Sequence, residues 1–144
     1  MNGPLIIGDE LWFYYRGSRS NERDKTANYT MSVGLARLRR DGFVSLDAGP
    51  EPGRVTTRPL TFAGRSLFVN ADVAEGGWVR AAVLSADSEP LDAYSLEDGV
   101  AITADTTRGR IAWKKAQHLA VADGDHVRLV FELKNAKLYS FWIE

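Results

Sequence analysis

Carboxylates are the side chains of this sequence that could perform hydrolytic chemistry. Glycoside hydrolysis needs two carboxyl groups roughly 5–9.5 Å apart across the scissile bond, and the candidates are Glu97, Asp98, Asp105, Asp123 and Asp125. Neighbouring residues of a strand point to opposite faces, so Glu97 and Asp98 cannot share a site while both lie in regular strand. Aspartate is also a preferred turn residue. We therefore expect these carboxylates to cap backbone amides in turns, and we predict no catalytic residue.

Nucleophiles and metal ligands are equally scarce in the chain. It has two histidines, His118 and His126, and no cysteine. It contains neither a Gly-x-Ser-x-Gly elbow nor a His-Glu-x-x-His pair, the patterns of serine hydrolases and zinc proteases. The Asp-x-Asp-x-Asp-Gly pattern of calcium loops is also missing. The sequence therefore predicts no metal site and no cofactor, and this chain alone is expected not to be an enzyme.

Sugar binding is the remaining chemistry for which suitable residue types are present. Aromatic rings can stack on the apolar face of a pyranose while carboxylates and arginines hydrogen-bond its hydroxyl groups. Three aromatic residues lie at expected strand starts or near loops, with polar side chains close by. The candidate ligand-binding residues are Trp78, Tyr94, Asp98, Asp105, Arg108, Arg110 and Trp113. The competing interpretation, favoured for Trp78 and Trp113, is that large rings of a small sandwich pack in its core.

Composition limits the class of protein. A length of 144 residues predicts one domain, or one domain with a small appendage, and 44% hydrophobic with 26% charged residues is typical of a globular protein. The net charge of −1 gives no reason to expect a nucleic-acid partner. No stretch approaches the ~18 apolar residues of a membrane span, and the N-terminus lacks the basic start of a signal peptide. We therefore expect a soluble chain without a membrane partner, and the sequence does not indicate its compartment.

Short apolar runs with a period of two predict an all-β chain. The strongest run directs Val127, Leu129, Phe131 and Leu133 toward a core, whereas Val130 suggests a strand covered partly on both faces. We expect strands at 11–16, 29–37, 43–46, 54–58, 66–73, 78–84, 94–97, 110–114, 126–134 and 137–143. Turns are expected at 40–42, 63–65, 75–77, 123–125 and 135–136, and one helical turn at 116–122. This pattern favours a two-sheet β-sandwich of jelly-roll type.

Two seams divide the chain. Residues 47–53 contain two prolines and two glycines, which is typical of a linker, and residues 17–28 form a long polar loop. Net charge changes near the linker, since residues 16–58 hold nine basic and five acidic side chains whereas 59–144 hold nine basic and twelve acidic ones. We therefore expect an N-terminal β-hairpin segment, 1–46, and a β-sandwich domain, 47–144.

The N-terminal segment contains four consecutive aromatic residues, Trp12, Phe13, Tyr14 and Tyr15. Each carries ~150–250 Å² of buriable surface, and a monomer rarely exposes more than a few hundred Å² of contiguous apolar area. We therefore expect these rings to be covered by the sandwich, by a second protomer or by an upstream domain. An exposed apolar strand edge would otherwise promote association.

Seven short segments spread along the chain carry a resemblance to a known family. They are 41–48 (DGFVSLDA), 57–60 (TRPL), 67–70 (LFVN), 94–98 (YSLED), 113–114 (WK), 127–133 (VRLVFEL) and 138–141 (LYSF). In this order they resemble the C-terminal part of bacterial proteins related to glycoside hydrolase families 32 and 43. The resemblance implies that residues 1–46 are similar to the last strands of a five-bladed propeller and that 47–144 are similar to the β-sandwich that follows it. It carries no catalytic residue to this chain, because the catalytic carboxylates of such propellers come mainly from earlier blades.

The function expected from these observations is a non-catalytic accessory module of a glycoside hydrolase-like protein, with possible carbohydrate contact. Two alternatives stay open. One is an autonomous lectin-like carbohydrate-binding domain. The other is a protein interaction or oligomerisation module that uses the aromatic N-terminal segment.

Overall fold

The computed structural model describes residues 3–19, 30–121 and 124–144. It divides the chain into two compact units, Met1–Phe43 and Val44–Glu144, so the division falls close to the seam expected after residue 46. Strands predominate in both units, and the 3-10 helix η1 (Asp92–Tyr94) is the only helical element among the described residues. The predicted all-β class is therefore confirmed.

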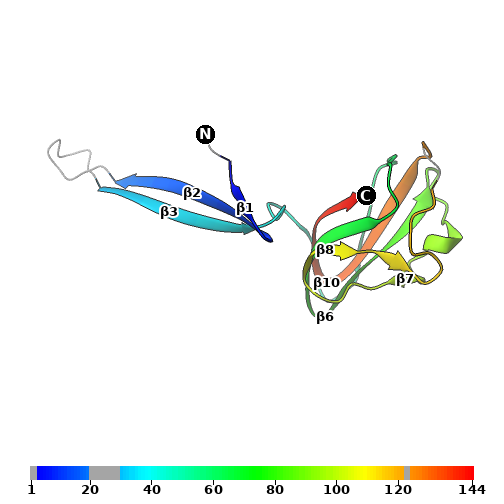
Figure 1. The fold of residues 1–144 in the computed structure, drawn as a ribbon. Coiled ribbons are helices and arrows are strands. Elements are labelled where there is room, and N and C mark those ends of the chain that lie inside the picture. Colours follow the sequence, from blue (N-terminus) through cyan, green and yellow to red (C-terminus); the bar gives the residue numbers. More distant parts are fainter. Residues whose placement is uncertain (1–2, 20–29, 122–123) are drawn as a thin grey trace. The chain divides into compact units, whose positions relative to one another are not determined.

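The first unit is a three-stranded antiparallel sheet. β1 (Leu5–Ile7), β2 (Glu10–Arg19) and β3 (Thr30–Arg39) lie in the order β1-β2-β3 (Figure 1). The expected hairpin is thus present as β2 and β3, with β1 added beside β2. Tyr15 pairs with Gly34 across these strands, and a Cβ atom at Gly34 would clash with the tyrosine ring. The ring therefore lies across the glycine and fills the space that a side chain would take.

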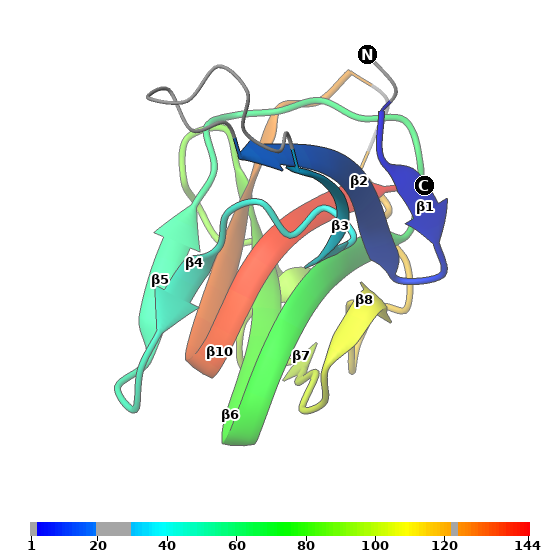
Figure 2. The same ribbon diagram turned by 90° about the vertical axis from the view of Figure 1, so that its left-hand side faces the viewer.

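A five-stranded antiparallel sheet is the framework of the second unit. β10 pairs with β6 on one side and with both β4 and β5 on the other, and β8 pairs with β6. Figure 2 shows β6 and β10 as long curved strands side by side in this sheet. The bounds of these strands are β4 (Leu46–Ala48), β5 (Gly53–Thr56), β6 (Leu67–Ser85), β8 (Thr106–Arg110) and β10 (Val127–Ile143).

A second, two-stranded sheet pairs β7 (Gly99–Val100) with β9 (Ala112–Trp113). The hydrophobic core of this unit includes alternate residues of β6 and β10, as predicted for the run that begins at Val127. Residues from η1, β9 and the segments beside them complete it, among them Tyr94, Ile111 and Trp113. Every buried member of this core lies in the second unit. The two sheets agree with the predicted β-sandwich, and the jelly-roll order of strands stays a prediction.

β6 and β10 are each continuous where the sequence predicted two strands separated by a turn. Asn135 alone lies opposite residues 74–77, so the expected turns form a bulge instead. Asn135 has a φ of 42° and Gly76 a φ of 70°, and these positive values interrupt the ladder without ending it. Gly77 has no room for a Cβ atom, which would clash with the carbonyl oxygen of Asn135. These residues have turn-like backbone angles, but the pairing of the two long strands continues past them, so no turn forms.

Further expected local elements are also wrong. Residues 94–97 form the end of η1 and a turn instead of a strand, and the described part of the expected helical turn, 116–121, is irregular. Asp41 has the positive φ expected of a turn, 53°. The strand that follows it is β4, however, which pairs with β10 and not with β3. The Asp-Gly turn therefore ends the first unit and does not close a hairpin.

Candidate functional site

Tyr94 and Trp113 were predicted to offer ring faces to a sugar, and the structure buries both of them. The Trp113 side chain is 2% exposed, and its Nε1–H donates a hydrogen bond of 2.8 Å to the carbonyl oxygen of Ala81. The two rings meet edge to face with centroids 5.1 Å apart. The Tyr94 hydroxyl accepts from the Ala120 amide at 2.7 Å and donates to the His118 carbonyl. These rings form part of the core, which corrects the prediction that they bind ligand.

The predicted polar residues are dispersed around the second unit. Arg108 stacks over the Phe68 ring and pairs with Glu144. Arg110 donates to the carbonyl oxygen of Gln117 at 2.8 Å. Asp105 is exposed. The structure therefore does not assemble these three residues with Tyr94 and Trp113 into one sugar-binding face.

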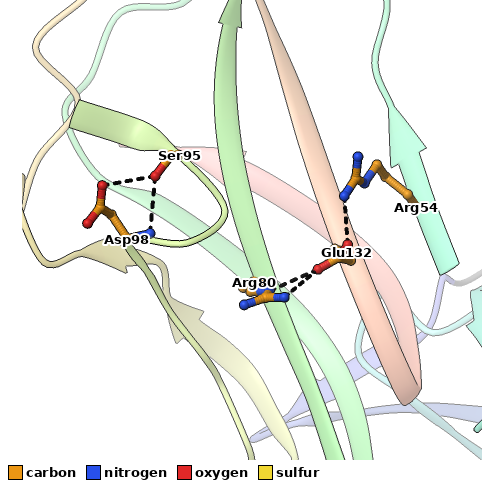
Figure 3. Close-up of polar contacts among 5 residues, drawn as sticks. All are labelled: Arg54, Arg80, Ser95, Asp98 and Glu132. Atoms are coloured by element: carbon orange, nitrogen blue, oxygen red, sulfur yellow. Dashed lines mark hydrogen bonds and ion pairs between the residues drawn. The ribbon is translucent and has the colours of Figure 1, made fainter. Parts of the chain in front are cut away.

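Asp98 has a structural role in the turn after η1. The Ser95 hydroxyl donates to the Asp98 carboxylate at 2.9 Å and accepts from the Asp98 amide at 3.1 Å (Figure 3). Lys115 pairs with the same carboxylate at 2.8 Å. The hydrogen bond from Lys115, reinforced by Ser95, holds the pKa of Asp98 below its ordinary value. This agrees with the expectation that the aspartates act as turn residues.

A buried carboxylate that the sequence did not single out joins three strands of the large sheet. Glu132 of β10 lies directly opposite Arg54 of β5 and Arg80 of β6. Both arginines reach its carboxylate at 2.8 Å, Arg54 at Oε1 and Arg80 at Oε2 (Figure 3). The side chain of Glu132 is only 12% exposed, whereas those of Arg54 and Arg80 are 59% and 33% exposed. The carboxylate is therefore enclosed, whereas both arginine side chains are partly exposed.

The two arginines decide the ionisation of Glu132. Burial alone would raise the pKa of this carboxyl group, because it disfavours the charged form. Hydrogen bonds and the positive charges of Arg54 and Arg80 outweigh burial, so the pKa of Glu132 lies below its ordinary value. The carboxylate is thus ionised at neutral pH.

A hollow of about 480 Å³ opens over this ion-paired group. Strand residues that include Arg54, Arg80, Ala82, Val130 and Glu132 line it, and the segment after β6 contributes Pro90, Ser95, Leu96 and Glu97. We refer to it as the Glu132 hollow. The Ser95–Asp98 hydrogen bonds fix one part of its lining, since Ser95 belongs to both. Val130 is buried on this face, which confirms that β10 is covered partly on both sides.

Trp78 is the one aromatic residue of the predicted site that belongs to this face of the sheet. Residues opposite one another in an antiparallel pair share a face, and Trp78 lies opposite Lys134, two positions from Glu132. The Arg80 guanidinium carbon stands 4.4 Å from the centroid of the Trp78 ring. The ring is half-buried, and it supports the arginine that holds Glu132.

The same face has a positive charge balance. The register places Arg54, Arg80, Arg128 and Lys134 on it together with Glu132. Arg128 donates to the carbonyl oxygens of Thr57 and Ala86, which holds its side chain along the sheet. Around Glu132 this register groups four cations with one anion, whereas Asp47, Asp72 and Lys137 lie together farther along the outward face.

Sequence reasoning expected Glu132 to face outward, away from the core, and the structure agrees. What it missed is the enclosure of that side chain and the participation of Arg54 and Arg80. The available signal was Val130, whose apolar side chain on the polar face indicated cover over this part of the strand. The partners themselves lie 78 and 52 residues away in the chain, and no local pattern connects them.

The N-terminal sheet presents a second candidate surface. Tyr14 and Tyr15, which point to opposite faces of β2, are 60% and 58% exposed. Trp12 and Phe13 find partners within the unit, since Arg37 stacks 4.5 Å from the Trp12 ring and Phe43 meets Phe13 edge to face. Further large apolar side chains of this unit are exposed as well: Leu5, Ile6, Ile7, Met31, Val33, Leu35 and Phe43.

Comparisons with family models, with curated proteins and with solved structures found no match to this chain. The resemblance to glycoside hydrolase-like proteins therefore stays a hypothesis. Within the described residues, no cluster of three or more histidine, aspartate or glutamate side chains could hold a metal ion. None of the helices in that part of the chain is long and apolar enough to cross a membrane.

Proposed function

We propose that this chain is a non-catalytic accessory module of a glycoside hydrolase-like protein, and that its N-terminal sheet docks against another domain of that protein. The observation that carries the proposal is the exposure of large apolar side chains on both faces of β1, β2 and β3. Tyr15 and Ile6 lie on one face, and Tyr14, Leu35 and Val33 lie on the other. The sandwich unit, by contrast, has its own core.

Burial energetics favour docking of this sheet. Fully burying one large apolar side chain contributes about 1.5–3 kcal/mol, so several exposed side chains represent a substantial unused stabilisation. β3 also has a strand neighbour on one side only, β2, among the described residues. Its other edge can therefore accept a further strand, and a long open edge of this kind is an aggregation hazard when left uncovered.

The sequence resemblance indicates which kind of domain would cover the exposed apolar side chains of the N-terminal sheet. Segments of this chain resemble the end of a five-bladed propeller, in which strands of this kind pack between neighbouring blades. The three antiparallel strands of the first unit are consistent with part of such a blade. A second copy of this chain is the other candidate partner, because the same exposed side chains would also drive self-association. A lectin-like role would depend on the sandwich unit instead.

Hydrogen exchange tests the docking role. The amides of β2 and β3 should exchange rapidly in the 144-residue chain and become protected when the chain is extended into a longer protein that includes a propeller domain. The amides of β6 and β10 should be protected in both proteins, which provides an internal control for folding. Protection of β2 and β3 in the unextended monomer would contradict the proposal. Protection that appears only with dimer formation, measured by sedimentation, would favour the interaction module instead.

A further inference from the structure

The Glu132 hollow is rich in hydrogen-bond donors that its own residues do not consume. A guanidinium group has five N–H donors in a planar fork. Arg54 directs one amino group, Nη2, at Glu132, and Arg80 directs Nε and Nη2 at it. Both side chains line the hollow and are partly exposed, so we infer that their remaining donors can reach a molecule that enters it. A ligand for this place must be rich in acceptor oxygens.

The charge of the surroundings favours an anion. Glu132 neutralises only one of the two arginines bound to it, and Arg128 and Lys134 add positive charge to the same sheet face. Glu97 contributes one opposing charge from an exposed position in the lining. A carboxylate is the group that matches a planar guanidinium fork, because two parallel N–H···O bonds can form.

Apart from the arginines and Glu132, the lining has three polar residues, Thr56, Ser95 and Glu97, and is otherwise apolar. Pro90 and Leu96 contribute accessible carbon surface beside the arginines, and Ala82 and Val130 lie buried at the base of the hollow. Trp78 supports the Arg80 guanidinium from below at 4.4 Å. A volume of about 480 Å³ lies within the usual range of small-ligand sites, roughly 300–1,000 Å³. The ligand should therefore combine a carboxylate and further oxygens with a compact apolar face.

We propose that the Glu132 hollow binds a uronate unit of an acidic carbohydrate, with its carboxylate on the remaining donors of Arg54 and Arg80 and its C–H face on Pro90 and Leu96. A sugar acid unites the three properties that the lining selects. The choice of a carbohydrate rests on the proposed accessory function, whereas the choice of a carboxylate rests on the arginines. Sodium glucuronate is the simplest probe of this site.

Amide chemical shifts of the full chain provide the test. Titration with glucuronate should shift the resonances of Arg54, Arg80, Val130 and Leu96. The Arg54→Gln variant should bind about tenfold more weakly, the loss expected for a charge-assisted hydrogen bond. Arg58→Gln makes the same change of charge at an exposed position outside the hollow lining, and it should stay within about twofold of wild type.

Each contrary result overturns the proposal in a recognisable way. Equal binding of glucose would remove the role of the carboxylate, and equal binding of acetate or phosphate at the same amides would leave a general anion site. Equal weakening by Arg54→Gln and Arg58→Gln would mean that only long-range charge matters. If Arg54→Gln fails to fold, Arg54→Lys keeps the charge but loses the fork, and unchanged affinity in that variant would also contradict the assignment. None of these outcomes affects the hydrogen-exchange test of the N-terminal sheet.

Discussion

Replacement of Glu132 by glutamine should destabilise the sandwich unit, because it removes the negative charge shared by two arginines and replaces one of the two acceptor oxygens by an NH2 donor. A hydrogen bond to a charged group typically contributes about 1.5–3 kcal/mol to stability. The side chains of Arg54 and Arg80 are 59% and 33% exposed, so water can partly solvate them in the variant. The cost should therefore stay below that of breaking a fully buried ion pair, about 3–5 kcal/mol. We expect Glu132→Gln to lose about 1–3 kcal/mol of unfolding free energy at pH 7.

The pH dependence of this loss has a definite sign. The pKa of Glu132 in the folded chain lies below its ordinary value of 4.5. The carboxylate therefore contributes its full stabilisation above the unfolded-state pKa, and this contribution is lost as pH falls through the lower folded pKa. The difference between wild type and Glu132→Gln should thus be constant between pH 7 and about pH 5.5, and it should shrink below about pH 4.5.

Urea unfolding followed by tryptophan fluorescence measures this difference. Glu144→Gln is the matched control, because it makes the same chemical change in an ion pair with Arg108 whose side chains are about half exposed. An exposed pair contributes about 0–1 kcal/mol, so the control should change stability little. Equal stability losses in Glu132→Gln and Glu144→Gln would refute the reasoning, as would a Glu132→Gln loss that stays unchanged from pH 7 to pH 3.

Two further substitutions test the framework around the site. Trp113→Phe removes the hydrogen bond to the buried carbonyl oxygen of Ala81 and should cost about 1–3 kcal/mol in urea unfolding; a cost near zero would mean that this bond contributes nothing. Gly77→Ala places a Cβ atom against the carbonyl oxygen of Asn135 and should lower the melting temperature, whereas Gly49→Ala, where nothing lies within 4 Å, should not. Equal melting temperatures of the two alanine variants would show that the bulge tolerates a side chain.

Local sequence patterns predicted the features that depend on alternation along one strand. The run from Val127 to Leu133 identified both the strand and its core face, since period two is a property of the extended backbone itself. The seam near residue 47 lies close to the observed division of the chain for a similar reason, because proline and glycine disfavour regular pairing wherever they occur. The turns expected at 75–77 and 135–136 are absent, although Gly76 and Asn135 within them do have positive φ values.

The tertiary structure determined which long-range contacts the residues of those local patterns make. The sequence alone could not show that the turn signals between 74 and 77 and at Asn135 face each other in one bulge, because strand pairing is a long-range property. Tyr94 and Trp113 have the residue types of a sugar platform, yet the packing of β9 and η1 against the large sheet buries them. Side-chain chemistry fixes which contacts are possible, and the packing of distant segments selects among them.

Only part of the candidate site could be predicted from the sequence. Glu132 is visible as a charged residue on the outward face of a strong strand, and Val130 indicates cover beside it. The register that places Arg54 and Arg80 on either side of that carboxylate joins positions 78 and 52 residues distant from it. A shift of one residue in either pairing would turn these arginines to the opposite face. The residue types were therefore determined by the sequence, and their assembly into a donor-rich hollow was determined by the pairing of three strands.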